Sequence, residues 1–146
     1  MEKLVFKAVI NAPRNKVWDI LWGDATYPVW TAPFAEGSRV ETNWEVGSRV
    51  LFLDANNRGM VSTIAEKVPN EFMSFKHLGD INNGVEDLTS DKVKEWAGSL
   101  ENYTLTAVDG KTELLVEMDM NEDFKNYFMD TWPKAVDKVR ELAEVN

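Results

Sequence analysis

The dipeptide Asp109-Gly110 lies between two stretches of alternating residues, and no other local feature constrains the fold of this chain as strongly. A two-residue type I′ turn needs a positive φ at both central positions, which Asp-Gly supplies readily. Alternation of apolar and polar residues on either side is the pattern of half-buried strands. The sequence therefore predicts a β-hairpin that joins strands at Gly98–Val108 and Lys111–Met120.

The register of this hairpin places one carboxylate on an otherwise apolar face. Counting back from the turn, the expected pairs on that face are Leu105 with Leu114, Tyr103 with Val116 and Glu101 with Met118. The opposite face should carry Asn102, Thr104 and Thr106 across from Glu117, Leu115 and Glu113. A carboxylate among apolar side chains needs a partner, or its pKa rises because desolvation disfavours the charged form. Glu101 is therefore either functional or at a wet sheet end that water, lysine or arginine reaches.

Short runs rich in valine, phenylalanine, threonine and leucine, separated by turn residues, extend the predicted sheet. The further strands expected are Lys3–Asn11, Ser38–Asn43, Arg49–Leu53, Gly59–Lys67 and Glu71–Leu78. Between Gly79 and Trp96 the sequence is polar and has no strong period, so we expect this segment to leave the sheet. Loops of that length often cover a site.

Apolar residues recur every three or four positions near the two ends of the chain, which is the spacing of a helix. The segment Asn11–Pro13 provides a capping side chain and a first-turn proline, which predicts a short helix ending near Trp22. The segment Tyr27–Pro33, with its prolines and large aromatic residues, should be irregular or briefly helical. From Glu122 onward apolar residues recur at helical spacing, which predicts a C-terminal helix with one buried stripe. Pro133 lies inside that pattern, so the helix should kink there or divide into two.

The composition excludes several classes of protein. The 146 residues amount to a single domain, 1–146, and 44% of them are hydrophobic, which is typical of a globular chain. A formal net charge of -9 would repel phosphate backbones, so nucleic-acid binding is not expected. Without cysteine the chain has no thiolate zinc site or thiol nucleophile, and one histidine cannot build a multi-histidine metal cage. We expect no metal and no cofactor.

The same observations bear on where the protein works. The N-terminal residues do not form a charged segment followed by a long apolar run, so no signal peptide is expected. No stretch approaches the roughly 20 apolar residues that span a bilayer, so membrane insertion is not expected. A chain without cysteine suits a reducing compartment, and we expect a cytoplasmic protein.

Few other side chains could carry chemistry. His77 ends a predicted strand on the same side as Met73 and Phe75, and it is either a catalyst or a structural histidine held by hydrogen bonds. Tyr103 is expected to pack, with its hydroxyl satisfied at the edge. We interpret the acids at 86, 87 and 91 as a solvated loop, because their spacing is not that of a calcium site. No phosphate-binding loop, nucleophile elbow or serine triad is present in the sequence.

The six tryptophans allow two interpretations. Trp18 and Trp22 lie four residues apart on the first predicted helix, where they can simply fill core space. The remaining four lie in or near predicted loops or beside Pro133, where they either fill the core or line the mouth of a cavity; they are Trp30, Trp44, Trp96 and Trp132.

The order of elements resembles the START-like, or SRPBCC, superfamily across essentially the whole chain. The residues that carry this resemblance are Ile10-Asn11-Ala12-Pro13, Val17-Trp18, Trp30, Gly47, Gly59-Met60-Val61 before Pro69, and Trp132-Pro133. Within the superfamily the chain looks most like the small bacterial relatives of the activator of the 90-kDa heat-shock-protein ATPase. The resemblance implies an α+β helix-grip fold, in which a curved antiparallel sheet wraps a long C-terminal helix and leaves a cavity between them.

Superfamily members use that cavity for lipids, sterols, polyketides or other hydrophobic ligands, and some are cyclases or dehydratases. On this fold the cavity of the present chain would be built from the inner face of the sheet, Trp30 and the C-terminal helix. The expected pocket residues are Trp30, Phe52, Phe75, His77, Glu101, Tyr103, Val116, Met118, Phe128 and Trp132.

Three functions follow, in order of preference. The first is binding of a small hydrophobic or amphipathic molecule without chemistry. The second is a cyclase- or hydratase-type enzyme with Glu101 or His77 as general base and Tyr103 as donor, which requires Glu101 and His77 to point into one cavity. The third is a chaperone-interacting module, which rests on the family alone.

Overall fold

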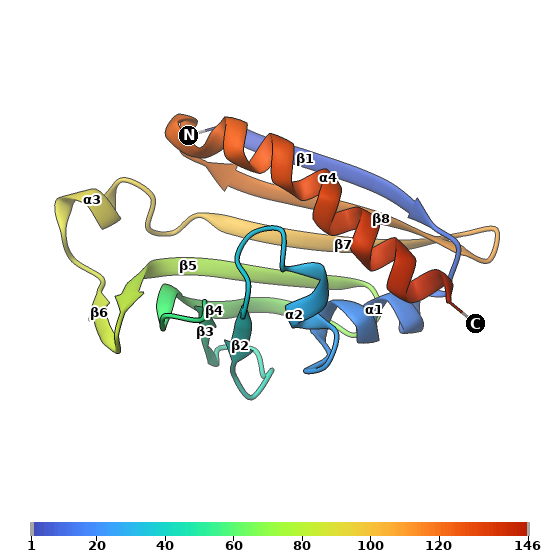
Figure 1. Ribbon diagram of the computed structural model, residues 1–146, viewed down its shortest axis with the longest axis horizontal. Helices are drawn as coiled ribbons and strands as arrows, with labels where there is room; N and C mark the ends of the chain where they lie inside the picture. Colours follow the sequence, from blue (N-terminus) through green and yellow to red (C-terminus); the bar gives the residue numbers. More distant parts are fainter. Residues whose placement is uncertain (1, 146) are drawn as a thin grey trace.

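The computed structural model describes residues 2–145 and contains one antiparallel sheet with helices on one face (Figure 1). The strands are β1 (Glu2–Ile10), β2 (Arg39–Glu41), β3 (Arg49–Leu53), β4 (Arg58–Val68), β5 (Phe72–Asn82), β6 (Val85–Asp87), β7 (Leu100–Val108) and β8 (Lys111–Met120). The helices are α1 (Arg14–Trp22), α2 (Tyr27–Trp30), α3 (Asp91–Lys94) and α4 (Glu122–Glu144). Among residues 2–145, no helix combines the length and the apolar character needed to cross a membrane.

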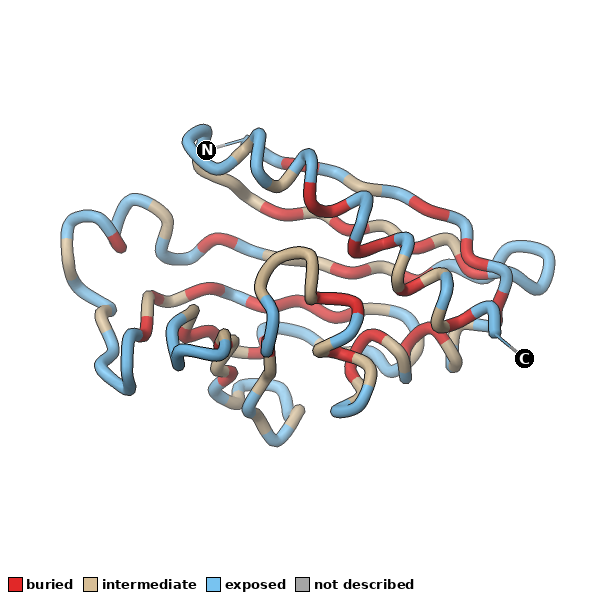
Figure 2. Tube along the Cα trace, viewed as in Figure 1, coloured by how far each residue is buried: buried red, intermediate tan, exposed pale blue. Residues whose placement is uncertain are grey.

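The strand order is β1-β8-β7-β5-β4-β3-β2, with the short β6 added to β5. Helix α4 crosses one face of this sheet, and α1 and α2 lie beside it on the same face (Figure 1). Buried positions alternate along the strands and recur along α4, as expected where one sheet face meets one helix stripe (Figure 2). The predicted helix-grip α+β fold is confirmed.

The hairpin at Asp109-Gly110 is confirmed in every predicted pair. Asp109 has a φ of 51° and Gly110 a φ of 80°, the two positive values that a type I′ turn needs. Leu105 pairs with Leu114, Tyr103 with Val116 and Glu101 with Met118. The turn therefore sets which side chains of β7 and β8 face the helices.

The prediction for Gly79–Trp96 is partly wrong. Strand β5 continues to Asn82 and turns back into β6 through Asn83-Gly84, whose φ values of 50° and 82° repeat the same turn chemistry. The segment then forms the short α3, whose first turn is capped by the Ser90 hydroxyl. Only the part after β6 leaves the sheet, because the Asn-Gly turn pairs β6 with the end of β5.

The strand prediction Ser38–Asn43 is too long, since only Arg39–Glu41 pairs with β3. The predicted cap of the first helix is also wrong. Pro13 occupies the N-cap position without a side-chain hydrogen bond, and the Asn11 backbone N–H donates instead to Glu144 Oε2 at 2.9 Å. The chain before α1 is thus tied to the end of α4.

Helix α4 is a single helix with Pro133 inside it, so the alternative of two helices is wrong. Proline removes one backbone hydrogen bond and normally breaks a helix. Here the stripe that faces the sheet spans both sides of the proline and holds the two halves together. Its buried members are Thr131, Trp132, Ala135, Val136, Val139 and Ala143.

Aromatic rings form the centre of the core. Trp22 meets Tyr103 and Phe75 edge to face, with ring centroids 4.8 Å and 5.3 Å apart, and also contacts Trp18, Trp30 and Trp44. Edge-to-face contacts are the arrangement that aromatic rings prefer. Trp22 therefore joins α1 to the inner face of the sheet.

Gly59 on β4 permits close pairing with β3. A Cβ atom on Gly59 would lie 1.7 Å from the Phe52 carbonyl oxygen, so no other residue fits there without moving β3 or β4. Strands β3 and β4 can consequently bring Phe52 and Met60 side by side.

Candidate ligand cavity

A cavity of about 290 Å³ lies between the inner face of the sheet, α2 with the segment that follows it, and α4. It is at the lower end of the volumes that small-molecule sites occupy. The lining residues are Tyr27, Trp30, Thr31, Phe34, Ala35, Ser38, Phe52, Leu53, Asp54, Arg58, Gly59, Met60, Glu101, Tyr103, Tyr127, Phe128 and Trp132.

Six of the ten residues expected at the pocket from the sequence line this cavity: Trp30, Phe52, Glu101, Tyr103, Phe128 and Trp132. Three others, Phe75, Val116 and Met118, are buried in the core and are not lining residues. His77 is also buried outside the lining, and it reaches the cavity only through its contact with Glu101. The segment 79–96 does not line the cavity, so the expectation that it covers the site is wrong.

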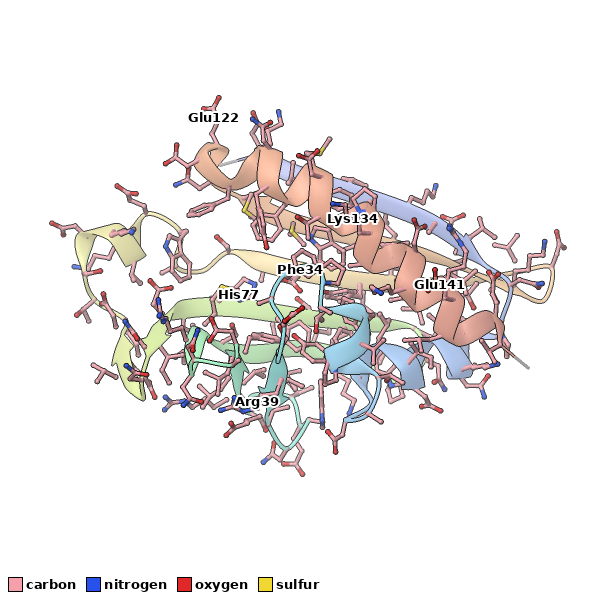
Figure 3. The ribbon with its side chains drawn as sticks, viewed as in Figure 1. Phe34, Arg39, His77, Glu122, Lys134 and Glu141 are labelled. Carbon is pink, nitrogen blue, oxygen red and sulfur yellow. The ribbon has the colours of Figure 1, made fainter. Side chains whose placement is uncertain are left out.

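Sequence reasoning missed three aromatic lining residues, Tyr27, Phe34 and Tyr127. Phe34 follows α2 and lies beside α4 (Figure 3), where its ring contacts Trp132 with centroids 5.0 Å apart. Tyr127 on α4 donates a hydrogen bond from its hydroxyl to the Phe34 carbonyl oxygen at 2.9 Å. This bond fastens the segment after α2 to the helix. The aromatic character of residues 27–34 and the Tyr127-Phe128 pair were the available signals.

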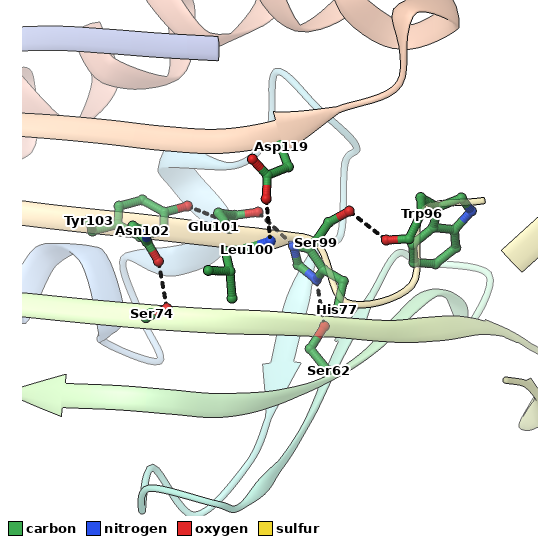
Figure 4. Close-up of polar contacts among 10 residues, drawn as sticks. All are labelled: Ser62, Ser74, His77, Trp96, Ser99, Leu100, Glu101, Asn102, Tyr103 and Asp119. Atoms are coloured by element: carbon green, nitrogen blue, oxygen red, sulfur yellow. Dashed lines mark hydrogen bonds and ion pairs between the residues drawn. The ribbon is translucent and has the colours of Figure 1, made fainter. Parts of the chain in front are cut away.

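A chain of four polar side chains crosses three neighbouring strands next to the cavity (Figure 4). Ser62 Oγ lies 2.7 Å from His77 Nδ1, and His77 Nε2 lies 3.2 Å from Glu101 Oε1. The Tyr103 hydroxyl donates to Glu101 Oε2. An ionised carboxylate only accepts, so the Nε2–H group of His77 donates to Glu101 Oε1, and Ser62 Oγ shares a hydrogen bond with Nδ1 on the other side of the ring. Glu101 therefore has partners on the apolar face, and they are neither lysine nor arginine.

The buried end of this chain is structural. Ser62 is fully buried, so its hydroxyl cannot meet a substrate despite the serine–histidine–glutamate order. Glu101 is different, because it lines the cavity and its side chain is 17% exposed. Of the four side chains in the hydrogen-bonded chain, Glu101 and Tyr103 line the cavity and can meet a ligand.

Burial and the charge of Glu101 both act on the two buried phenols that line the cavity. Burial, and then the charge of Glu101, raise the pKa of Tyr103 well above its ordinary value. The same two causes, in the same order, raise the pKa of Tyr27. Both phenols consequently stay protonated at neutral pH, and the Tyr103 hydroxyl donates to Glu101.

The acids at 86, 87 and 91 do not gather as metal ligands. Within the described residues 2–145, no group of three or more histidine, cysteine, aspartate or glutamate side chains could hold a metal ion. Glu86 forms an ion pair with Arg49, and Asp87 accepts hydrogen bonds from the backbone N–H groups of Thr89 and Ser90. The hydrogen bond from the Ser90 backbone is the main cause that lowers the pKa of Asp87, followed by a hydrogen bond from the Ser90 side chain.

Comparison with known proteins gives the family. The model of the family described as Activator of Hsp90 ATPase homolog 1-like protein (AHSA1) matches residues 11–144. The chain belongs to this family. The resemblance inferred from the sequence is thereby confirmed at the level of the family, and the AHSA1 match runs from the residue after β1 to the end of α4.

Solved structures show the same fold at low sequence identity. The Aha1 dimer of Colwellia psychrerythraea is 16% identical with a TM-score of 0.76, covering 99% of this chain and 98% of that one. Protein MLL2253 of Mesorhizobium loti is 18% identical with a TM-score of 0.72, covering 97% and 96%. DynU16, from the dynemicin biosynthetic locus, is 13% identical with a TM-score of 0.73, covering 99% and 48%. No curated protein is matched by sequence. These similarities establish the fold of this AHSA1 chain. Its function has to be inferred from the residues of the cavity.

Proposed function

We propose that this protein binds a small hydrophobic or amphipathic molecule in the cavity between the sheet and α4. The observation that carries the proposal is the cavity itself, about 290 Å³ with predominantly aromatic and aliphatic walls. Apolar walls with a few convergent polar groups are the usual form of a small-molecule site. Glu101 and Tyr103 are the polar groups that would orient the molecule. The lack of cysteine suits the reducing cytoplasm, where we expect the protein to work.

The size of the cavity narrows the ligand class. A volume near the lower limit of known sites favours molecules of one or two rings over full sterols or long acyl chains. Aromatic walls favour flat rings, which can meet Trp30, Phe34 and Trp132 face to face or edge to face.

A thermal-shift screen of the purified protein tests this proposal. The panel should contain fatty acids, sterols, flavonoids and polyketide-like aromatics, with native mass spectrometry of the protein as isolated. A ligand at 100 times its dissociation constant stabilises the fold by about 2.7 kcal/mol, which raises Tm by several degrees. We expect the small aromatic compounds to give the shifts. If no compound raises Tm and no bound molecule appears in the mass spectrum, the cavity is not a ligand site. A protein partner, such as a chaperone, then becomes the better hypothesis.

The polar chain favours one second function, an enzyme of cyclase or hydratase type. Glu101 faces the cavity and is held by His77 and Tyr103, as a general base must be held. The condition set from the sequence, that Glu101 and His77 point into one cavity, is not met, because His77 does not line the cavity. His77 cannot serve as the base there, and this function would rest on Glu101 alone with His77 orienting it. Incubating each compound that binds with the protein and analysing the products by mass spectrometry separates this function from binding alone.

A further inference from the structure

The cavity wall is unusually rich in aromatic faces. Eight of its seventeen lining residues are aromatic: Tyr27, Trp30, Phe34, Phe52, Tyr103, Tyr127, Phe128 and Trp132. Several of the rings gather around Trp132, whose centroid lies 5.0 Å from that of Phe34, 6.0 Å from Tyr103 and 6.1 Å from Trp30. The face of an aromatic ring carries partial negative charge and attracts cations. A cation in this cavity would therefore be near several such faces.

The carboxylate of Glu101 keeps hydrogen-bonding capacity for a ligand. Glu101 accepts one hydrogen bond from His77 and one from Tyr103. A carboxylate has about four lone-pair sites, so about two remain for another donor. Tyr103 is a neutral donor, so its hydrogen bond adds no positive charge beside the carboxylate.

Among the described lining residues, Arg58 is the one basic residue of the cavity, and it is exposed. It lies beside Asp54, whose pKa is lowered first by hydrogen bonds from the backbone of Arg58 and Asn56, and further by the charges of Arg58 and Arg39. Burial is the main cause that raises the pKa values of Tyr27 and Tyr103, and the negative charge of Glu101 is the second cause at both tyrosines.

We infer that the natural ligand carries an organic ammonium group, which Glu101 and the surrounding aromatic rings recognise inside the cavity. This inference rests on the proposed function and adds the chemical class of the ligand. A charged hydrogen bond to a carboxylate is about twice as strong as a neutral one. Desolvated cations over aromatic faces gain further attraction, while an anion in the same place would face Glu101 unpaired.

Three probes with the same aromatic ring system and different charges separate the contribution of the charge to affinity from that of the ring. Isothermal titration calorimetry would compare naphthylethylamine, naphthylethanol and naphthylacetate, which are cationic, neutral and anionic at neutral pH. We expect the amine to bind about tenfold more tightly than the alcohol, or better, and the anion to bind most weakly. Equal binding of amine and alcohol overturns the ammonium inference but leaves the proposed function intact. Binding of none of the three overturns both.

Two matched variants then assign the preference to Glu101. Glu101→Gln removes the negative charge at position 101, and we expect it to abolish the preference for the amine over the alcohol. Glu117→Gln removes a charge from the outer face of the same hairpin, where Glu117 pairs with Lys3 at 3.5 Å, and should keep the preference. A preference that survives in Glu101→Gln, or that disappears in both variants, contradicts recognition by Glu101. If Glu101→Gln does not fold, the comparison of the three probes on the natural protein still decides the inference.

Discussion

Replacing Ala35 by tryptophan is expected to weaken binding of naphthylethanol by about 100-fold or more. Ala35 lines the cavity from the segment that follows α2, outside the regular helices and strands. An indole ring at this position would occupy part of the cavity that the ligand needs. No residue of the hydrophobic core is changed, so the fold should be kept. The measurement is a calorimetric titration of both proteins at the same temperature and salt.

The matched control for this substitution is Ala107→Trp. Ala107 is exposed on β7 and does not line the ligand cavity, so the added ring should leave the dissociation constant within about twofold. A variant at position 35 that binds as tightly as the natural protein would place the ligand elsewhere. Thermal unfolding of both variants shows that any loss of binding is not a loss of fold.

Replacing Trp22 by alanine is expected to cost about 3–5 kcal/mol of unfolding free energy. Trp22 is buried, contacts five aromatic rings and joins α1 to the sheet. Its removal leaves a cavity that neighbouring rings cannot fill without moving. Since domains of this size are stable by about 5–15 kcal/mol, much of the total is lost. Urea unfolding followed by circular dichroism measures the change.

The control here is Trp96→Ala, which deletes the same side chain from a half-buried position after α3. We expect a cost below about 1 kcal/mol, because no fully buried cavity is created. Equal costs at the two positions would contradict the central place of Trp22 in the core. The two tryptophans thus separate the effect of packing from the effect of residue type.

Turn chemistry accounts for what could be predicted of the sheet. Asp109-Gly110 is a local signal, and it determined the register of β7 and β8 and the inward position of Glu101. Asn83-Gly84 carries the same signal, yet the flanking residues are polar and β6 is only three residues long, so alternation did not reveal the second hairpin. A turn dipeptide is informative only when the strands around it also alternate.

The cavity was predictable only in part, because periodicity tells which face a residue occupies and not how completely its neighbours fill the space. Phe75 and Val116 are on the correct face but are buried under other side chains. The contact of His77 with Glu101 depends on pairing between β5 and β7, which are separated along the chain by β6 and α3. Such long-range pairing has no local signature.

The tryptophans offer the most direct test of ligand binding in the cavity. In a ¹⁵N-labelled sample the six indole N–H groups give six separate reporters. On titration with naphthylethanol, ring currents should move the signals of Trp30 and Trp132, which line the cavity, and leave those of Trp18 and Trp96 in place. Saturable shifts confined to Trp30, Trp132 and their ring neighbours are the predicted result. Unmoved signals at saturating probe, or a shift of Trp96 alone, would contradict a ligand site between the sheet and α4.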